Sequence, residues 1–331
     1  MAERKGQKIK IVCTLDILKK YSDEDHPITA TEICEKLSAM GVTAERKSVY
    51  DDITNLIDYG YDIIRASSPK RGFFLASREF EVPEIYLLTD AVRTAKFITP
   101  KKTRELISKL DSMLSENQAG LREKRIYIDS INKCNNEEIY YSIDVLSDAI
   151  AKNKQVEFDY ITRTINADRT VGFVTKHRTI SPYALTWQDD HYYLIGNYDK
   201  YDNIVHFRLD RMRKVTLTDI PRRYFGEVSD YSEYFDIADY TSKLFSMHSG
   251  KLETVELCCN REIAEQVFDR FSTNIFIKNF NDQSFDFSVK AAVSEALVTW
   301  IMNYGDKVKV KSPESLKQMI KSRAKAVLDL Y

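Results

Sequence analysis

Glycine, cysteine and histidine are scarce in this sequence, and each shortage excludes a class of site. Only 10 of the 331 residues are glycine, and none of them belongs to a glycine-rich loop of the kind that cradles phosphate groups. Five scattered cysteines without CxxC spacing and five histidines without ligand spacing support neither a disulfide framework nor a metal site. We therefore expect a protein of the reducing cytoplasm that needs no metal and no cofactor.

Long apolar runs and catalytic motifs are missing as well. The first residues carry no apolar signal core, and no run approaches the length needed to cross a bilayer, so we expect no membrane association. No nucleophile elbow, zinc-hydrolase helix or acid–base pair is found in the sequence. We therefore expect binding and not catalysis, and a protein that is not an enzyme.

Neither sign of charge is in excess. The chain has 49 Lys and Arg against 50 Asp and Glu, and residues 1–75 alone contain twelve of each class. Any binding of nucleic acid must therefore come from local patches and not from the overall charge. A length of 331 residues predicts two or three domains, each large enough for its own core.

The N-terminal 80 residues show three short helical patterns and a hairpin pattern. Helices are expected over residues 8–22 and 32–40, a third helix ends at Gly60, and a hairpin with a basic tip spans residues 63–75. This order is typical of a winged helix-turn-helix, which we assign to residues 1–80. The buried stripe of the third helix is expected to contain Val49, Ile53, Leu56 and Ile57.

The opposite face of the third helix, the N-terminal flanks of that face and the hairpin tip carry side chains suited to DNA. Arginine and lysine read guanine or neutralise phosphate, and serine and tyrosine anchor phosphate. We therefore expect double-stranded DNA as a partner, contacted by Arg46, Lys47, Ser48, Tyr50, Lys70 and Arg71. The alternatives are a solvated helix face and an ordinary soluble hairpin tip. Asp51 on the same helix face counts against strong binding to phosphate.

Residues 81–141 are expected to form a helical linker that also serves dimerisation. Apolar residues recur at helical spacing from Val82 to about Asn132, and Pro100 marks the turn of a helical hairpin. Because helical hairpins with apolar stripes on both sides usually have a partner, we expect a homodimer.

A helix followed by the strands of a small β-barrel is expected over residues 142–220. The side chains of two of these strands alternate with the period of two that a half-buried strand requires. In this register Tyr192 points into the core, while Tyr193, His206 and Arg208 gather on an accessible patch. Cations beside a phenol suit a phosphate or a nucleobase.

The rest of the chain divides into a tether and a C-terminal module. Residues 221–252 are irregular and rich in tyrosine and phenylalanine, which predicts a tether that packs down. Residues 253–331 alternate strands and helices, which predicts an α/β two-layer module. Trp187 continues the alternation of Tyr183 and Leu185 at period two, and we expect it in the core.

In its order of elements and in two motifs the chain resembles the WYL-domain transcriptional regulators. The name motif Trp-Tyr-Leu stands here as Tyr192-Tyr193-Leu194, and the family's Phe-Arg-Leu-Asp-Arg run is complete at Phe207–Arg211. Trp300…Tyr304-Gly305-Asp306-Lys307-Val308 followed by Pro313-Glu314 resembles the family's C-terminal extension, called WCX. The resemblance implies a multidomain α+β protein with a winged helix-turn-helix, a helical linker, a small SH3-like β-barrel (the WYL domain) and the two-layer WCX module.

The resemblance also implies a function. It points to a bacterial, cytoplasmic, homodimeric regulator whose WYL domain binds a nucleotide-type or single-stranded nucleic-acid effector. The effector site is then expected to contain Arg178, Ser181, Tyr193, His206, Arg208 and Arg211. Arg211 reaches the site only if a bulge or turn follows Asp210, because it otherwise shares the parity of Phe207.

Two other interpretations stay open. In the first, the arginines form only a structural network in which Asp210 pairs with Arg208 or Arg211. In the second, the chain is an accessory protein that binds single-stranded nucleic acid or an effector nuclease, and its N-terminal domain serves assembly. The balanced charge of residues 1–75 and Asp51 favour this second alternative.

Overall fold

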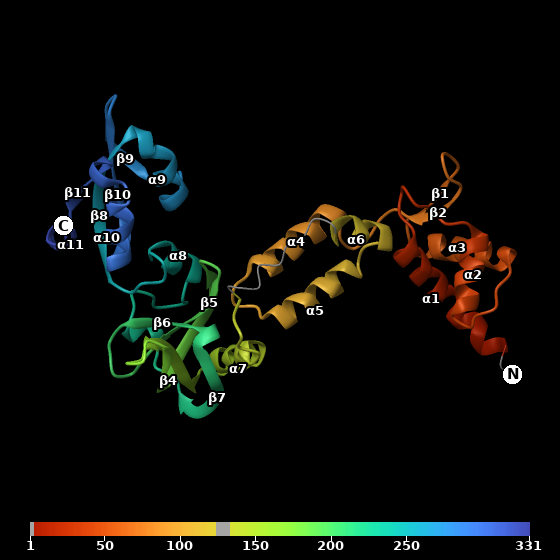
Figure 1. The fold of residues 1–331 in the computed structure, drawn as a ribbon, viewed down its shortest axis with the longest axis horizontal. Helices are drawn as coiled ribbons and strands as arrows, with labels where there is room; N and C mark the ends of the chain where they lie inside the picture. The colour runs from red at the N-terminus through yellow and green to blue at the C-terminus, as the bar shows by residue number, and fades with distance from the viewer. Residues whose placement is uncertain (1–2, 124–132) are drawn as a thin grey trace. The chain divides into compact units, whose positions relative to one another are not determined.

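The structure is a computed structural model that describes residues 3–123 and 133–331 (Figure 1). It is a mixture of helices and three separate β-sheets, as expected for a multidomain α+β chain. The chain divides into two compact units, Met1–Asn135 and Asn136–Tyr331. Within the described residues, none of the helices combines the length and the apolar character that a membrane crossing requires.

Unit 1 begins with three helices and a hairpin around a single core. The elements are α1 (Glu3–Tyr21), α2 (Ala30–Ala39), α3 (Arg46–Tyr59), β1 (Ile63–Ala66) and β2 (Gly72–Leu75). Thr29 and Glu32 form a capping box at the start of α2, and Gly60 ends α3 in the left-handed conformation with φ of 114°. The fully buried side chains of this core come from all three helices: Ile17, Leu18, Ile33, Leu37, Val49, Ile53 and Leu56.

The burial predicted for one residue of the α3 stripe, Ile57, is wrong. Ile57 is 45% exposed, whereas Asp52, which the sequence analysis did not assign to the stripe, is buried. The reason is a buried ion pair: Lys10 of α1 places its Nζ 3.0 Å from Asp52 Oδ2 and so turns this side of α3 toward α1. The helix therefore buries Val49, Asp52, Ile53 and Leu56.

Three further helices complete unit 1: α4 (Val82–Thr94), α5 (Pro100–Asp111) and α6 (Glu116–Glu123). Pro100 begins α5, where its missing N–H costs nothing, and the hydroxyl of Thr99 accepts a hydrogen bond from the Lys102 N–H. The last part of the helical pattern expected up to residue 132 falls on residues 124–132, which lie outside the described residues.

Unit 2 opens with α7 (Ile139–Lys152) and a five-stranded antiparallel sheet. Its strands are β3 (Lys154–Ile165), β4 (Val171–Gln188), β5 (His191–Asn197), β6 (Ile204–Arg208) and β7 (Met212–Pro221), and their order is β6-β5-β4-β3-β7. The long strand β4 pairs with β3 over its first half and with β5 from Ser181 onward. A short 3₁₀ turn, η1 (Leu209–Arg211), joins the two edge strands β6 and β7. Among the described residues this sheet is open, so the closed barrel that we expected is not shown.

The chain then passes through a tether and ends in the second sheet of unit 2, which has four strands. The tether holds the 3₁₀ turn η2 (Phe225–Glu227) and α8 (Ile237–Ser242). The strands that follow are β8 (Lys251–Asn260), β9 (Phe276–Phe280), β10 (Ser284–Val293) and β11 (Val308–Ser312), in the order β11-β8-β10-β9. The connecting elements are η3 (Arg261–Ile263), α9 (Ala264–Phe271), α10 (Glu295–Met302), η4 (Gly305–Lys307) and α11 (Glu314–Leu328). Val267, Leu297 and Leu316, one from each α-helix, are buried in one core with the sheet.

Candidate functional site

The first turn of α3 presents cations to solvent. Arg46 and Lys47 are exposed, and neither pairs with a carboxylate in the part of the chain that the structure describes. Ser48 is half-buried, and its hydroxyl donates a hydrogen bond of 3.0 Å to the Glu45 carbonyl. Tyr50 is 37% exposed and contacts the Phe73 ring of β2 edge-on, at 5.7 Å between centroids. The face predicted from the sequence is therefore accessible.

A buried ion pair, which the sequence analysis missed, fixes how α3 presents this face. The Lys10 ammonium donates to the Ser48 carbonyl at 3.0 Å and pairs with Asp52, and the Thr14 hydroxyl donates to Asp52 at 3.3 Å. The side chains of Lys10 and Asp52 are 10% and 9% exposed. Because buried charges must be paired, this contact ties the rotation of α3 to α1. The only signal for this ion pair in the sequence was Asp52, a charged residue three positions after Val49 in the apolar stripe of α3.

The hairpin holds two more predicted contacts, Lys70 and Arg71, at its exposed tip. Neither residue forms an ion pair within the described chain. The base of the hairpin is anchored because Ile28 and Phe73 exchange backbone hydrogen bonds of 3.0 and 2.7 Å. Gly72 permits this approach: a Cβ atom there would lie 2.6 Å from the Ile28 carbonyl oxygen.

The strand register of unit 2 places the expected effector residues on one face. Tyr193 pairs with Arg208, and Ile195 pairs with His206, in the β5–β6 ladder. Directly paired residues share a face, so Tyr193, His206 and Arg208 lie on the same side of the sheet as expected. The exposure that we expected is wrong, however. Tyr193 is buried at 9% exposure, whereas Tyr192 is half-buried.

The tether explains the burial of Tyr193. Tyr240, Leu244 and Met247 from the tether form one buried cluster with Tyr193 and Ile195. The tether therefore covers the face that the sequence analysis left open. Its aromatic composition was the available signal, but period-two alternation cannot tell which face a segment some 40 residues later will cover.

His206 is the polar link between this face and the tether. Its Nε2 lies 3.0 Å from the Tyr240 hydroxyl, and its Nδ1 lies 3.2 Å from Ser249 Oγ. Burial lowers the pKa of His206 to about 4. The imidazole is therefore neutral near pH 7 and uses one nitrogen as a donor and the other as an acceptor. It serves as a structural bridge in this arrangement.

Arg208 is paired with Asp210 by two hydrogen bonds. Nε and one terminal nitrogen of Arg208 donate to the two carboxylate oxygens at 3.0 and 2.8 Å. Burial lowers the pKa of Arg208, but the hydrogen bond and charge of Asp210 outweigh it and raise the pKa above its usual value. Burial likewise raises the pKa of Asp210, but Arg208 brings it below its usual value. This is the ion pair that the structural interpretation of the motif expects.

The other expected effector residues differ in how available they are. Arg178 is half-buried, and its guanidinium lies 5.4 Å from the centroid of the Tyr198 ring. Ser181 is fully buried and accepts a hydrogen bond of 2.9 Å from the Arg223 N–H, so it serves packing. Arg211 is exposed, because η1 supplies the turn after Asp210 that its access required.

Trp187 does not lie in the core as we expected. It is 46% exposed. It pairs with Tyr192 near the end of the β4–β5 ladder, two residues before the turn at Asp189 and Asp190. At the end of a hairpin the side chains still alternate between the two faces of the sheet, but no core lies against them there. Periodicity alone therefore overestimated the burial of Trp187.

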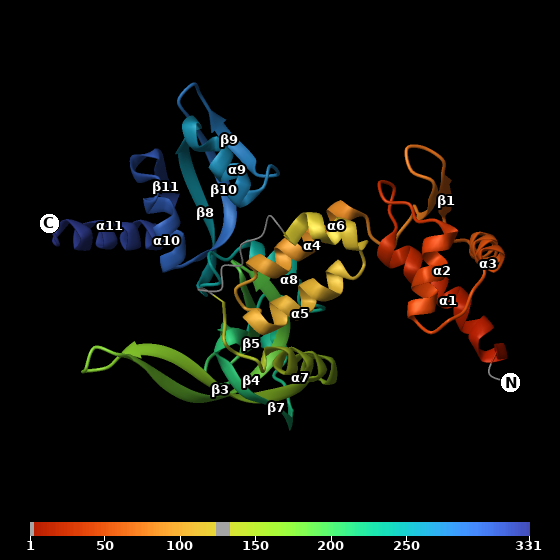
Figure 2. The same ribbon diagram turned by 45° about the vertical axis from the view of Figure 1, so that its right-hand side comes forward.

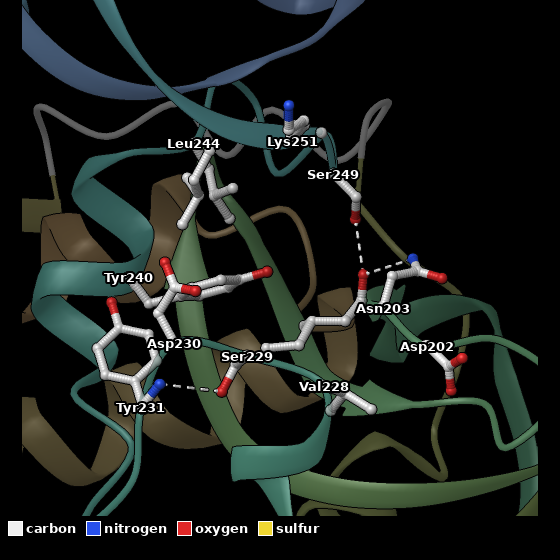
Figure 3. Close-up of a pocket in the computed structure, with 13 residues that line it drawn as sticks. Asp202, Asn203, Val228, Ser229, Asp230, Tyr231, Tyr240, Leu244, Ser249 and Lys251 are labelled. Atoms are coloured by element: carbon white, nitrogen blue, oxygen red, sulfur yellow. Dashed lines mark hydrogen bonds between the residues drawn. The ribbon is translucent and has the colours of Figure 1, made fainter.

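A pocket of about 610 Å³ lies between the tether and the β5–β6 connection. Figure 3 shows the rings of Tyr231 and Tyr240 on one side of it and Asn203 and Ser249 on the other. Its carboxylates are engaged, because Asp202 pairs with Arg223 at 2.9 Å and Asp230 with Lys290 at 3.2 Å. The lining residues are Asp202, Asn203, Ile204, Val228, Ser229, Asp230, Tyr231, Tyr240, Leu244, Ser249, Gly250, Lys251 and Leu252. No motif or periodicity in the sequence marks this pocket.

Nothing in the described residues resembles a metal site. No group of three or more His, Cys, Asp or Glu side chains is placed to hold a metal ion there. All five cysteines are free, and Cys258 and Cys259 lie in strand β8. The chemical groups that stand out are cations, tyrosine rings and hydroxyls, which suit the binding of anions and bases.

Comparison with known proteins identifies two domains in unit 2. The family model of the WYL domain matches residues 142–217, and that of the WCX domain matches residues 251–328. No curated protein matches the chain. Among solved structures the chain is similar to "Proteasome accessory factor B/C (PafBC) of Arthrobacter aurescens", with 16% sequence identity and a TM-score of 0.28. That match covers 97% of this chain and 48% of the other, so this chain spans about half the length of that protein.

Proposed function

We propose, from the premise that this chain carries a WYL domain followed by a WCX domain, that it is a DNA-binding transcriptional regulator. In this proposal α1 to β2 form a winged helix-turn-helix that binds double-stranded DNA. The strands of residues 142–217 form the SH3-like WYL fold, whose effector controls DNA binding. The protein acts by binding and is not an enzyme.

The observation that carries the proposal is the division of α3 into two faces. One face buries Val49, Ile53 and Leu56 in the core of unit 1. The other face presents Lys47 to solvent, and Arg46 is exposed at the start of the helix; neither has a carboxylate partner in the described chain. An unpaired cation at the start of an exposed helix is available to a phosphate or to the guanine edge in a major groove. The exposed tip of the hairpin adds two cations of the same kind.

Removal of the cations of α3 tests the proposal. Arg46→Ala with Lys47→Ala should weaken binding to a duplex of the protein's own promoter region, and the slope of log affinity against log salt should shrink by about 0.9 for each lost contact. Fluorescence anisotropy at several salt concentrations measures both quantities. The thermal midpoint should stay within about 1 °C, because both side chains are exposed.

The matched control is Lys101→Ala with Lys109→Ala, which removes two exposed cations from α5. This control should bind DNA like the unmodified protein. Equal losses in both variants would mean that α3 makes no special contact. A protein that prefers single-stranded nucleic acid and ignores both pairs of substitutions would support the rival function of an accessory protein.

The effector is proposed to be anionic and to carry a base, either a nucleotide or a single-stranded nucleic acid. Arg178 beside the Tyr198 ring supports this chemistry, since it joins a planar cation to a surface on which a base stacks. Arg211, the last residue of the Phe207–Arg211 motif, is exposed. Arg208 of the same motif is held in an ion pair by Asp210. Access of an effector to Arg208 requires that this ion pair opens.

Arg178→Ala tests the effector site. A charged contact is worth about 1.5–3 kcal/mol, so the affinity for a labelled single-stranded oligonucleotide or a nucleoside triphosphate should fall about ten- to a hundredfold. Arg261→Ala is the control, because it removes a similar pair of a cation and a ring, 4.8 Å from Phe280. Binding of both probes that is unchanged by Arg178→Ala would leave only the structural interpretation of these arginines.

A homodimer is part of the proposal. Exposed apolar side chains on α4, such as Leu87 at 72% exposure, support a partner for the helices of unit 1. Analytical ultracentrifugation should give twice the mass of the chain, and Leu87→Glu should return the protein to a monomer. A monomer at all micromolar concentrations would contradict this part.

A further inference from the structure

The strands β3 and β4 extend beyond their sheet as a two-stranded ribbon, which we define as residues 161–176. Strand β3 pairs with β7 only as far as Tyr160, and β4 pairs with β5 only from Ser181 onward. Between these points β3 and β4 pair with each other alone, from Ile161 opposite Thr175 to Ile165 opposite Val171. Figure 2 shows this ribbon reaching past the other strands of its sheet.

The ribbon carries apolar side chains that nothing in the described chain covers. Ile165, Val171 and Phe173 are 81%, 64% and 68% exposed. Arg163 opposes Phe173 and Ile165 opposes Val171, so all of these side chains share one face. An isolated two-stranded hairpin is at best marginally stable in water. A projecting ribbon with such a face is typical of a segment that docks on something else.

The charges of the ribbon indicate what it docks on. Arg163, Arg169 and Lys176 are exposed, and none of them pairs with a carboxylate within the described residues. The single carboxylate of the ribbon, Asp168, is used by the turn, since it accepts hydrogen bonds of 3.0 and 2.6 Å from the N–H and hydroxyl of Thr170. The ribbon therefore carries three cations against one carboxylate in a chain whose net charge is −1. This local excess of positive charge favours a negatively charged partner such as a phosphate backbone.

We infer that the β3–β4 ribbon is a second DNA-contacting element, which binds duplex DNA along a groove. The major groove admits a two-stranded β-ribbon as well as it admits an α-helix. In this arrangement Arg163 and Arg169 neutralise phosphates beside the apolar face, which lies against sugars and thymine methyl groups. Lys176, which pairs with Tyr160 and lies on the opposite face of the ribbon, contacts the phosphates on the other side. The inference rests on the proposed DNA-binding function and adds a contact from unit 2 to those of α3 and the hairpin tip.

The test compares two triple variants of the full-length protein. The ribbon variant carries Arg163→Ala, Arg169→Ala and Lys176→Ala. The control variant carries Lys309→Ala, Lys321→Ala and Lys325→Ala, which removes the same charge from exposed positions of β11 and α11. Binding to a long promoter duplex is measured by anisotropy against salt. The ribbon variant should bind about tenfold more weakly or worse, with a salt slope reduced by about 2 to 3, whereas the control should match the unmodified protein.

Phe173→Trp supplies a second readout that does not depend on charge. The exposed side chain at this position should change its tryptophan fluorescence when duplex DNA is added, and Tyr201→Trp, at an exposed position of the β5–β6 connection, should not. A circular dichroism spectrum and thermal midpoint like those of the unmodified protein show that each variant is folded.

The outcomes separate this inference from the proposed function. A loss of affinity in the Arg46→Ala/Lys47→Ala variant but not in the ribbon variant would overturn the ribbon contact alone. A loss in the ribbon variant alone would support the ribbon and contradict the role of α3. A ribbon variant that keeps its DNA affinity but changes from dimer to monomer, or loses only single-stranded binding, would also overturn the inference.

Discussion

At the scale of the single residue, His206 makes the stability of unit 2 sensitive to acid. Its ordinary pKa is about 6.5, and burial lowers it to about 4 in the folded protein. Between these pH values the unfolded chain binds a proton at this residue that the folded protein does not. The free energy of unfolding is therefore highest above about pH 6.5 and declines as the pH falls toward 4. The hydrogen bonds to Tyr240 and Ser249 depend on the neutral ring.

The expected result is a larger loss of stability in acid for the unmodified protein than for His206→Gln. Between pH 7 and pH 5 the difference should be about 1–2 kcal/mol, since one pKa unit corresponds to about 1.4 kcal/mol and the site is partly open to solvent. Urea unfolding at the two pH values measures it. Parallel pH dependence in both proteins would show that His206 does not titrate as described.

The site residues were predictable from the sequence where local periodicity decides their exposure. Lys47 lies opposite the apolar stripe of α3 and Arg46 at the N-terminal flank of that face, and both are exposed as expected. Tyr193 was placed on the correct face but with the wrong exposure, because Tyr240 and its neighbours in the tether cover it. Alternation determines the face of a strand. It carries no information on a distant segment that packs against that face.

At the scale of the element, the packing of α1 against α3 depends on one buried ion pair. Lys10→Met should lower the free energy of unfolding of unit 1 by about 3–5 kcal/mol, because it leaves the Asp52 carboxylate buried without its partner. Lys10→Met combined with Asp52→Leu should recover most of this loss, since two apolar side chains then fill the same space. Urea unfolding of the three variants checks the cycle. Equal destabilisation in the single and double variants would mean that packing, and not charge, holds α1 on α3.

The elements themselves were largely predictable, and the exceptions have physical reasons. Strands such as β8 and β11 bury every second residue, and Pro100 begins α5 where the turn of a helical hairpin was expected. The β3–β4 ribbon was not foreseen. Ile161 and Ile165 alternate as they would in a half-buried strand, although Ile165 is 81% exposed. Periodicity reports which residues share a face and is silent on whether the protein supplies a partner for that face.

At the scale of the whole molecule, the chain has two compact units, each with its own core. Two glycines provide a separate probe for each unit. A Cβ atom on Gly72 would lie 2.6 Å from the Ile28 carbonyl oxygen in unit 1, and one on Gly196 would lie 2.6 Å from the Ser181 carbonyl oxygen in unit 2. Backbone atoms cannot move aside as a flexible side chain can, so each substitution strains one unit only.

Differential scanning calorimetry should therefore resolve two transitions that respond separately. Gly72→Ala should lower one of them and Gly196→Ala the other, each by about 1–3 kcal/mol or several degrees. Gly120→Ala in α6 is the control, because nothing lies within 4 Å of its added Cβ and alanine favours helix; it should leave both transitions in place or raise one slightly. If either glycine variant lowered both transitions together, the two units would unfold as one cooperative body, and the effector proposed for unit 2 would then stabilise the proposed DNA-binding elements of unit 1 directly.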